Sequence, residues 1–461
     1  MAERFNVVVI GSGPGGYAAA IRCAQKGASV ALVEKDQMGG TCLNRGCIPS
    51  KALLGSVHFM TLARHAKLMG VEIGSITPNW AAMQKRKDAI VAGFRGGVSG
   101  LLRSNKVKVF EGCGIVPAPG QVRVDGPGGG QTIAGDKIIL ATGSAPIQIG
   151  AFPYDGHTII SSTDALSLPA VPASMVIIGG GVIGCEMACV YAAMGCAVTI
   201  VEALPQVLPT EDDWVGALMA KELKKLGITC LTGGKVTGVD TSDKGAVVHV
   251  ESHADIPAEK VLVAVGRRAC CDSETVQSLG LDMNGPAVKV NRRMETSAPG
   301  VYAIGDLVGT TYLAHGAFAE AEVAAANATG GNEEMDDYSL VPRAVYTFPE
   351  VASVGKNEKA CAAEGREVVV GSAPFRTNGR SVCHNENVGE IRVIRDKTTD
   401  SVVGVTMVGA VVTEMTAAAR ALLGSREPIE RVCFAHPTVS EVLKEAWEDA
   451  FGISLHVPPR R

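Results

Sequence analysis

The sequence is poor in aromatic residues, carries no strong charge of either sign and contains no long apolar run. Aromatic residues make up only 4% of the chain, and the formal net charge is -4 at pH 7. So small a net charge gives no electrostatic reason to expect a nucleic acid or an anionic membrane as a partner. No apolar run approaches the roughly 20 residues that cross a bilayer, and the N-terminus enters a strand pattern without an apolar signal region. We therefore expect a soluble, cytoplasmic protein with no nucleic-acid and no membrane partner.

The cysteines lack the pattern of a disulfide framework. There are 13 of them, an odd number, scattered along 461 residues. Most are therefore expected to be reduced thiols in a reducing compartment, and their spacing indicates no metal site. Hydrophobic residues make up 46% of a chain long enough for two to four domains, and there are 55 glycines. Abundant glycine suits nucleotide-binding folds, in which the backbone approaches a ligand closely.

An internal repeat organises the front half of the chain. Residues 7–34 recur as residues 176–202, and each copy has an apolar strand, a GxGxxG turn, a helix and a second strand that ends in glutamate. Each of these glutamates follows the first glycine of its copy by 23 residues. The glycines are Gly11, Gly13 and Gly16 in the first copy, and Gly179, Gly181 and Gly184 in the second. This pattern is typical of a dinucleotide-binding unit, so two copies predict two dinucleotides.

Each part of the repeat has a physical role in holding a pyrophosphate. The first glycine makes the tight turn, the second lets the phosphates approach, and the third lets the helix pack on the strand. Glu34 and Glu202 are then placed to accept hydrogen bonds from a ribose. The three residues after Glu202 include no Arg or Lys to meet a 2′-phosphate, which favours NAD over NADP in the second site. The alternative is that Glu202 merely ends a strand at the surface.

Three further apolar strands end in small residues. Residues 137–143 and 260–266 close the two copies, and a strand near Val301 ends at Gly305 and Asp306. Small residues at the carboxyl edge of a parallel sheet leave space for a nucleotide. Asp306 is a candidate for binding a cofactor hydroxyl, and a simple cap of the strand end explains it equally well.

The segment 39–51, GGTCLNRGCIPSK, is the most informative stretch of the chain. Cys42 and Cys47 are too far apart for a CxxC motif and lack the second pair of a zinc site, but they suit a short disulfide loop entering a helix. Pro49 is tolerated in the first helical turn. Lys51 follows Cys47 by four residues, on the same helix face, where its charge would favour a thiolate. A structural disulfide and two buried thiols are the alternatives.

The pattern changes after the linker 330–337. Alternating runs predict antiparallel strands, and two helical stretches follow, which indicates an α+β domain suited to an oligomer interface. In this domain His436 precedes Pro437, which pushes it off the helix. Glu441 has capping-box spacing from Thr438, so it can simply close the helix N-terminus. Alternatively, Glu441 holds one ring nitrogen of His436 and leaves the other as an acid/base.

Together these motifs resemble the pyridine nucleotide–disulfide oxidoreductase family and, within it, the dihydrolipoamide dehydrogenases. GGTCLNRGCIPSK and HPTVSE are highly specific, and the resemblance runs along essentially the whole chain. It implies an α/β fold with two Rossmann-like dinucleotide-binding domains and a C-terminal α+β dimerisation domain. The implied segments are 1–148 for FAD binding, 149–272 for NAD binding, 273–337 returning to the FAD or central domain, and 338–461 for the interface.

The resemblance also implies which residues contact the cofactors. FAD would occupy the first dinucleotide site and NAD the second. Lys51 would lie against the flavin and pair with Glu186. Gly266 matches a family position near NAD. The positions that match family contacts to FAD are Gly114, Thr142, Gly143, Ser144, Asp306 and Ala314.

The implied activity is oxidation of dihydrolipoamide with reduction of NAD. Cys42 would attack the substrate, and Cys47 would face the flavin. His436, oriented by Glu441, would be the acid/base for the cysteines of the other subunit of a homodimer. No lipoyl domain precedes the first strand, so we expect the substrate on the lipoyl domain of a separate 2-oxoacid dehydrogenase or glycine cleavage complex. An NADPH-dependent reductase of a small disulfide and a binding module without turnover are the rival functions.

Two positions depart from the family pattern. Phe434 stands where relatives often have histidine, which could alter the substrate channel. Cys270 and Cys271 lie in the run that follows Gly266, and we interpret this adjacent pair as incidental.

Overall fold

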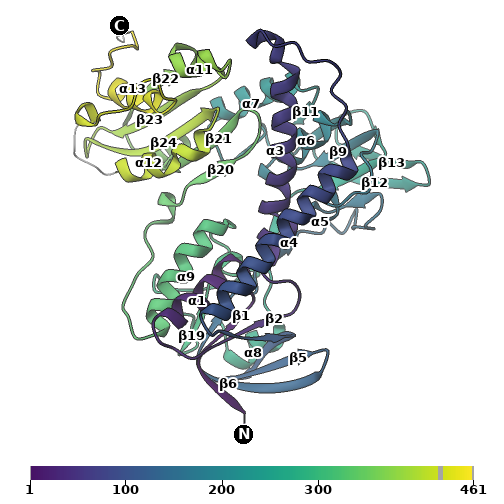
Figure 1. The fold of residues 1–461 in the computed structure, drawn as a ribbon, viewed down its shortest axis with the longest axis vertical. Coiled ribbons are helices and arrows are strands. Elements are labelled where there is room, and N and C mark those ends of the chain that lie inside the picture. Colours follow the sequence, from purple (N-terminus) through teal and green to yellow (C-terminus); the bar gives the residue numbers. More distant parts are fainter. Residues whose placement is uncertain (1, 424–428, 459–461) are drawn as a thin grey trace. The chain divides into compact units, whose positions relative to one another are not determined.

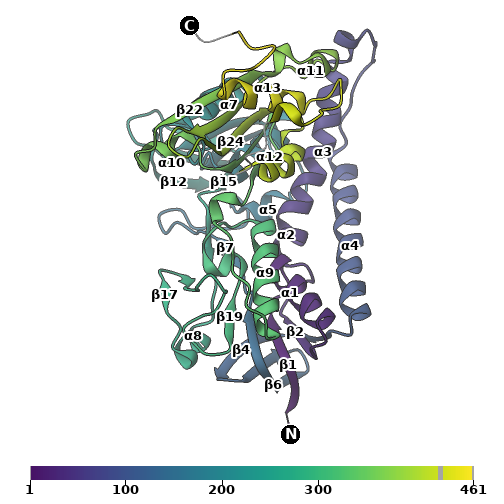
Figure 2. The ribbon, with the colours of Figure 1, turned by 90° about the vertical axis from the view of Figure 1, so that its left-hand side faces the viewer.

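The computed structural model describes residues 2–423 and 429–458. Their contacts divide the chain into two compact units, each assembled from three segments (Figures 1 and 2). The first unit contains Met1–Ala52, Ala82–Ile147 and Gly266–Tyr338, and the second contains Leu53–Ala81, Gln148–Val265 and Ser339–Arg461. The four domain boundaries expected from the sequence stay a prediction.

The first unit is built on a seven-stranded sheet. Its strands are β1 (Glu3–Ile10), β2 (Val30–Glu34), β3 (Lys108–Glu111), β4 (Cys113–Ala118), β5 (Gln121–Gly126), β6 (Gly129–Leu140) and β19 (Val301–Ala303). The order is β3-β2-β1-β6-β5-β4, with β19 also paired to β6. β1, β2, β3, β6 and β19 pair in parallel, whereas β5 pairs antiparallel with β6 and β4 pairs antiparallel with β5. The carboxyl ends of the parallel strands therefore share one edge.

Helices cover this sheet and bury its central strands. Residues 7–10 of β1 are all buried, as expected for a parallel strand covered on both faces. Helices α1 (Pro14–Gln25) and α9 (Ala314–Ala328) lie side by side (Figures 1 and 2). The other short elements are α2 (Gly40–Arg45), β7 (Ser144–Pro146), β16 (Arg267–Ala269), α8 (Ser273–Leu279), β17 (Met283–Asn284), β18 (Ala287–Val288) and η2 (Gly305–Val308). Two long helices, α3 (Cys47–Arg64) and α4 (Trp80–Ser104), have residues in both units.

The second unit contains a five-stranded parallel sheet in the order β11-β10-β9-β15-β8. These strands are β8 (Ile159–Ile160), β9 (Ser174–Ile178), β10 (Ala197–Glu202), β11 (Thr229–Thr232) and β15 (Lys260–Val263). A three-stranded antiparallel sheet joins β12 (Val236–Ser242), β13 (Gly245–Val250) and β14 (Ile256–Ala258). The helices of this part are α5 (Ser162–Ala165), α6 (Val182–Ala193) and α7 (Asp213–Lys225), and η1 (Ala66–Met69) follows α3. The β9–α6–β10 arrangement repeats that of β1–α1–β2, as the internal repeat predicts.

The back half of the chain forms a five-stranded antiparallel sheet in the second unit. Its strands are β20 (Arg343–Val345), β21 (Glu350–Gly355), β22 (Val368–Pro374), β23 (Glu390–Asp396) and β24 (Ser401–Gly409). The helices are α10 (Glu358–Ala363), α11 (Gly379–Cys383), α12 (Thr416–Leu422) and α13 (Glu441–Ala450), with 3-10 turns η3 (Tyr338–Leu340), η4 (Phe375–Thr377), η5 (Val412–Met415) and η6 (Ile429–Arg431). Helix α13 packs against β22 and β23 (Figure 1). The predicted α+β domain is confirmed.

Candidate active site

The first glycine-rich turn joins β1 to α1 in a conformation that only glycine fits. Gly11 has a φ of +100°, and a Cβ added there would lie 2.3 Å from the carbonyl oxygen of Ala141. A Cβ at Gly16 would lie 1.8 Å from the carbonyl oxygen of Gly11, so α1 packs on the turn only without a side chain. At Gly13, in contrast, no described atom lies within 4 Å of an added Cβ. This open side, at the N-terminus of α1, is the side that a pyrophosphate needs.

The second turn, between β9 and α6, has the same geometry. Gly179 has a φ of +109°, and an added Cβ would lie 2.5 Å from the carbonyl oxygen of Ala264. A Cβ at Gly184 would lie 2.0 Å from the carbonyl oxygen of Gly179, whereas none of the described atoms comes within 4 Å of one at Gly181. Both turns therefore fit a dinucleotide, as the sequence predicts.

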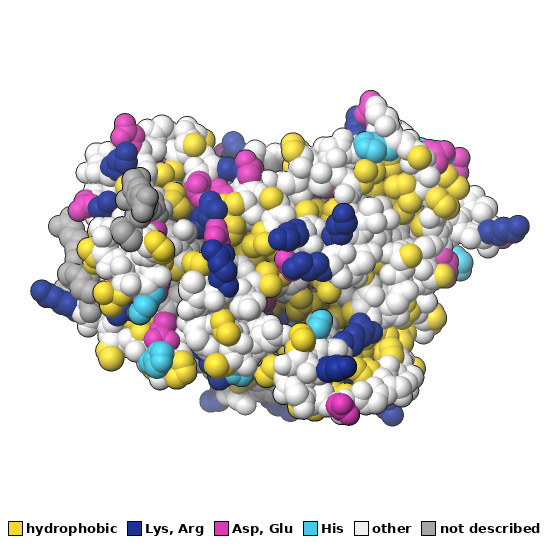
Figure 3. All heavy atoms as spheres, turned by 90° about the horizontal axis from the view of Figure 1, so that it is seen from above, with side chains coloured by type: hydrophobic (Ala, Val, Ile, Leu, Met, Phe, Trp, Pro, Cys, Tyr) yellow, Lys and Arg dark blue, Asp and Glu magenta, His cyan; other side chains and the backbone are white. Residues whose placement is uncertain are grey.

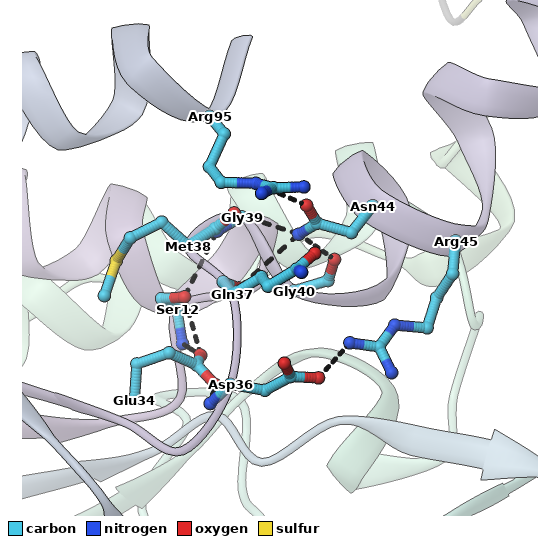
Figure 4. Close-up of polar contacts among 10 residues, drawn as sticks. All are labelled: Ser12, Glu34, Asp36, Gln37, Met38, Gly39, Gly40, Asn44, Arg45 and Arg95. Carbon is cyan, nitrogen blue, oxygen red and sulfur yellow. Dashed lines mark hydrogen bonds and ion pairs between the residues drawn. The ribbon is translucent and has the colours of Figure 1, made fainter. Parts of the chain in front are cut away.

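The glutamates that end the second strand of each copy are buried against their turns. Glu34 Oε2 accepts hydrogen bonds from the backbone N of Ser12 at 2.7 Å and from its Oγ at 2.6 Å, and Oε1 accepts one from the N of Asp36 at 2.8 Å (Figure 4). Glu202 Oε2 likewise accepts a hydrogen bond from the N of Gly180 at 2.7 Å. Each glutamate is only 8% exposed, which excludes the alternative that Glu202 ends a strand at the surface.

The segment that carries Cys42 is fastened to the first glycine turn by polar contacts (Figure 4). The backbone N of Gly39 donates to the carbonyl oxygen of Ser12 at 3.1 Å. Asn44 Nδ2 donates to the carbonyl oxygen of Gly40 at 2.9 Å, and its Oδ1 accepts from Arg95 Nε at 3.0 Å. Sequence reasoning missed Asn44 and Arg95. Asn44 lies inside the cysteine motif and could have been considered, whereas Arg95 comes from α4, where no motif marks it.

Cys42 and Cys47 meet at the junction of α2 and α3. Helix α3 begins at Cys47, with Pro49 in its first turn and Lys51 one turn on, as predicted. The two thiols form a hydrogen bond, which together with burial raises the pKa of Cys42, while the charge of Lys51 acts in the opposite direction. Thiol–disulfide exchange within a cysteine pair requires the two sulfur atoms to approach one another, and the hydrogen bond between Cys42 and Cys47 meets that requirement. Their predicted catalytic roles belong to the proposal below.

The strand-end residues form a polar cluster around Asp306. Ser144 Oγ donates a hydrogen bond to the Asp306 carboxylate and accepts one from Arg267 Nε at 2.7 Å. Arg267 Nε also lies 3.6 Å from Asp306 Oδ2. Thr142 Oγ1 donates to the carbonyl oxygen of Cys270 at 2.5 Å. The structure thus brings Ser144, Asp306 and Thr142 to neighbouring elements, and it adds Arg267, which sequence reasoning did not assign to a site.

The other predicted cofactor residues have specific backbone environments. A Cβ at Gly114, on β4, would lie 2.8 Å from Ile10 Cγ2, so close packing requires glycine there. Gly143 has a φ of +74° and Gly266 one of +117°, and Ala314 is the first residue of α9. Their contacts to FAD and NAD stay predictions.

A buried glutamate that the sequence did not reveal lies beside this cluster. Glu320, on α9, is 1% exposed and accepts hydrogen bonds from the backbone N of Gly305 at 2.5 Å and from the Tyr338 hydroxyl at 2.8 Å. Burial raises the pKa of Glu320 to about 7, and the charge of Asp306 acts in the same direction. The Ala-rich sequence of α9 has no motif that marks this residue. Glu320 fastens the turn that carries Asp306.

Glu186 lies on α6 in the second unit, next to the second glycine turn. It is 3% exposed, and its Oε1 accepts a hydrogen bond from the backbone N of Tyr346 at 3.1 Å. Burial raises the pKa of Tyr346, and the nearby charges of Glu350 and Glu186 add to the effect. The pairing of Glu186 with Lys51 stays a prediction.

His436 and Glu441 form a pair at the start of α13. Glu441 Oε1 lies 2.9 Å from His436 Nδ1, and Oε2 accepts a hydrogen bond from the backbone N of Thr438 at 2.8 Å. The helix begins at Glu441 with Ser440, not Thr438, at its N-cap, so only half of the expected capping box forms, and the Thr438 hydroxyl donates to the carbonyl oxygen of Ala435. Although burial opposes it, the hydrogen bonds from Thr438 and His436 hold the pKa of Glu441 below its ordinary value. Glu441 therefore both fastens the helix start and orients the imidazole.

Comparison with known proteins defines the class. Residues 5–325 match the pyridine nucleotide-disulphide oxidoreductase family, and residues 341–447 match the dimerisation domain of that family. The chain belongs to this family. It is a flavoprotein disulfide oxidoreductase with FAD and NAD as cofactors, and its dimerisation domain makes it a homodimer, as predicted.

The similar curated proteins are dihydrolipoyl dehydrogenases. The chain is 36% identical to the one from Bacillus subtilis (strain 168), over 98% of this chain and 100% of that protein. It is 40% identical to dihydrolipoyl dehydrogenase 3 of Pseudomonas putida, over 99% and 100% of the two chains. Among solved structures, the flavoprotein disulfide reductase RclA from Escherichia coli is similar, with a TM-score of 0.85, 26% identity and coverage of 96% and 99%. Within the described residues, no helix combines the length and apolar composition needed to cross a membrane.

Proposed function

We propose that this enzyme oxidises dihydrolipoamide, carried on the lipoyl domain of a 2-oxoacid dehydrogenase or glycine cleavage complex, and reduces NAD to NADH in the cytoplasm. The observation that carries the proposal is the contact between the Cys42 and Cys47 thiols on a segment fastened to the first glycine turn. The names of the relatives in Bacillus subtilis and Pseudomonas putida support the choice of substrate.

The residues of both turns suit the two cofactors. Gly13 and Glu34 would hold FAD at its pyrophosphate and ribose, and Gly181 and Glu202 would hold NAD in the same way. The carboxylate of Glu202 would repel a 2′-phosphate, which favours NAD over NADP. Bound FAD would supply the electron transfer between the cysteine pair and NAD.

The chain's own chemistry is thiol–disulfide exchange. A thiolate of dihydrolipoamide attacks the Cys42 sulfur of the oxidised pair, and Cys47 leaves as a thiolate. The second substrate thiolate then displaces Cys42, so oxidised lipoamide departs and two electrons remain in the cysteine pair. Lys51, one turn after Cys47, supplies positive charge that stabilises the Cys47 thiolate.

In this scheme the His436–Glu441 pair accepts the proton that the substrate thiol loses. His436 of the partner subunit accepts a proton from the substrate thiol at Nε2, because its Nδ1 is held by Glu441. The carboxylate keeps the ring in one orientation and stabilises the imidazolium that forms, as in other carboxylate–histidine pairs.

An anaerobic titration with dihydrolipoamide tests the proposal. Visible spectra of the FAD-loaded enzyme should develop a long-wavelength band from the Cys47 thiolate beside the flavin, and later addition of NAD should yield NADH. Cys47→Ser is the control, since it should bind FAD, develop no band and turn over no lipoamide. If glutathione but not dihydrolipoamide produces the band, the proposed substrate class is wrong. If no thiol produces the band, the dithiol mechanism is wrong.

A further inference from the structure

The segment that joins β10 to α7 is fastened at its first half to the second glycine turn. It spans residues 203–212 and directly follows Glu202. The backbone N of Leu208 donates a hydrogen bond to the carbonyl oxygen of Gly180 at 2.8 Å. The backbone N of Leu204 donates one to Glu202 Oε1, also at 2.8 Å. The conformation of this half of the segment is therefore tied to that of the turn.

The same half of the segment is closely packed and adopts an unusual backbone conformation. A Cβ added at Gly180 would lie 3.1 Å from Glu202 Cβ and 3.2 Å from Val207 Cγ1. Val207 and Leu208 are buried. Leu208 has a φ of +50°, a conformation that a bulky side chain rarely adopts, so it persists only where its surroundings hold it. The segment therefore needs restraint from beyond the glycine turn.

The second half of the segment is held by the dimerisation domain. Arg343 Nε donates a hydrogen bond to Glu211 Oε1 at 2.9 Å. Asp212 Oδ1 accepts one from the backbone N of Lys359 at 3.0 Å, and Lys359 Nζ donates to the carbonyl oxygen of Glu211 at 2.8 Å. Arg343 and Lys359 both belong to residues 341–447, which match the dimerisation domain of the family. This domain thus supplies the restraint.

A short chain of hydrogen bonds connects Arg343 to the glycine turn. Arg343 holds the side chain of Glu211, whose backbone N donates to the carbonyl oxygen of Leu208 at 2.9 Å. The backbone N of Leu208 then donates to the carbonyl oxygen of Gly180. Gln206 Nε2 also donates to the carbonyl oxygen of Glu211, at 3.0 Å, and so closes the loop between the two halves. A displacement of Glu211 therefore acts on the turn through a single intervening residue.

The ion pair between Arg343 and Glu211 differs from the ion pairs at the surface. Lysine and arginine side chains stand at the surface across the face drawn in Figure 3. Ion pairs in such exposed positions contribute little, because solvent screens them. The side chain of Glu211 is only 4% exposed, and among the described residues its Oε2 has no hydrogen-bond partner. Loss of the Arg343 guanidinium would leave a buried carboxylate uncompensated, which is strongly unfavourable.

We propose that Arg343 and Glu211 are positioning residues for NAD. Through this pair the dimerisation domain holds the segment 203–212, and with it the second glycine turn, in the geometry that receives the dinucleotide. The inference rests on the placement of NAD at Gly181 and Glu202 proposed above. While the pair is intact, the segment is ordered before NAD arrives. Once the pair is broken, part of the binding free energy has to restore the segment, so the affinity falls.

The test is a calorimetric titration of the oxidised, FAD-loaded homodimer with NAD. Arg343→Gln should raise the Kd for NAD about tenfold, and the KM for NAD should rise with it while kcat changes far less. Glu211→Gln should raise the Kd less, because the Arg343 side chain is 31% exposed and water can solvate it. The double variant replaces the ion pair by two amides, which removes the buried charge. It should therefore recover most of the affinity that Arg343→Gln loses.

Arg366→Gln is the matched control. Arg366 Nη1 lies 2.8 Å from Asp396 Oδ2, and the Asp396 side chain is 3% exposed, but this pair joins β23 to the residues before β22. The variant should leave the Kd for NAD unchanged. If it raises the Kd as much as Arg343→Gln does, or if Arg343→Gln lowers thermal stability without raising the Kd, the proposal is wrong. Should Arg343→Gln not fold, a wild-type Kd in Glu211→Gln would overturn the proposal.

Gly181→Ala separates this proposal from the placement of NAD on which it rests. If Gly181→Ala and Arg343→Gln both raise the Kd, both hold. If only Gly181→Ala raises it, the placement stands and the role of Arg343 fails. If only Arg343→Gln raises it, the role of Arg343 stands and Gly181 does not receive the pyrophosphate. If neither raises it, both fail. The titration uses no dihydrolipoamide, so its outcome does not depend on the proposed substrate.

Discussion

Two glutamates near the predicted cofactor and substrate positions show how surroundings decide the charge of one residue type. Glu320 is 1% exposed, and burial beside Asp306 raises its pKa to about 7. Glu441 is half-buried, and despite the effect of burial, donors from Thr438 and His436 lower its pKa. Glu441 is therefore a permanent anion suited to orienting an imidazole, whereas Glu320 changes its charge near neutral pH.

The raised pKa of Glu320 predicts a pH-dependent stability. Protonated Glu320 contributes fully to stability below its unfolded-state pKa of about 4.5. That contribution is lost as the pH rises through the folded-state pKa of about 7. Over that window the free energy of unfolding should fall by at most about 3 kcal/mol through this group. Glu320→Gln mimics the protonated form, so it should flatten the decline. Urea denaturation at about pH 5 and pH 8 measures the difference.

The same helix offers a control for this experiment. Glu322, also on α9, is 55% exposed and pairs with Arg22 at the surface. Surface ion pairs contribute little, so Glu322→Gln should leave the pH dependence of wild-type stability in place. If Glu320→Gln behaves like Glu322→Gln, Glu320 does not titrate in this range.

His436→Gln should separate the two halves of the catalytic cycle. Loss of the acid/base should slow the dihydrolipoamide half-reaction by roughly 100-fold or more. NADH oxidation by an artificial acceptor does not need the substrate proton, so it should change far less. Stopped-flow reduction by dihydrolipoamide and steady-state NADH oxidation provide the two rates. Equal losses in both would remove His436 from its proposed role.

At the scale of elements, the two strand–turn–helix copies reproduce one another in detail. In each turn the first glycine has a positive φ, the third has no room for a Cβ, and the second faces open space. A GxGxxG pattern with a glutamate 23 residues on predicts this geometry because every requirement is local to one β–α–β unit. Helix α3 was predictable for the same reason, since Cys47, Pro49 and Lys51 lie within two turns.

Contacts between distant segments were not predictable in this way. Arg95 donates a hydrogen bond to Asn44, which lies 51 positions earlier in the sequence, and Arg267 donates one to Ser144, which lies 123 positions earlier. The local sequence around Arg95 and around Arg267 gives no signal that predicts these contacts. The capping box at Thr438 was only half right: Glu441 accepts a hydrogen bond from the backbone N of Thr438, but the helix begins at Glu441 with Ser440 at its N-cap.

The repeat permits a matched pair of substitutions, Gly13→Ala and Gly181→Ala. Both positions have room for a Cβ in the described structure, so each variant should fold with unchanged thermal stability as apoprotein. Gly13→Ala should reduce FAD content, and Gly181→Ala should retain FAD but raise the KM for NAD several-fold, because a methyl group keeps a pyrophosphate at a distance. Flavin absorbance and steady-state kinetics report the two effects. If Gly181→Ala instead reduced the FAD content and Gly13→Ala raised the KM for NAD, FAD and NAD would have to exchange sites.

At the scale of the whole molecule, each unit is assembled from three separate segments, and the family's dimerisation domain occupies residues 341–447. Cys42 and Cys47 belong to the first unit and His436 to the second. In the proposed mechanism these groups act together only across the homodimer, so each of its two active sites takes cysteines from one chain and the imidazole from the other. In that arrangement, a single chain cannot turn over lipoamide, because each active site needs residues of both chains.

Mixed dimers of Cys47→Ser and His436→Gln chains test this arrangement directly. In a mixed dimer, one site receives both defects, while the other combines intact cysteines with an intact His436 of the partner subunit. If the two variants pair at random, half of the dimers are mixed and each has one working site, so about a quarter of the wild-type lipoamide turnover should return. If His436 served its own chain, both sites of every mixed dimer would carry one defect and turnover would stay at the level of the separate variants. Co-expression with two different tags isolates the mixed dimer, whose turnover per bound FAD should then be about half that of wild type, since one of two sites works.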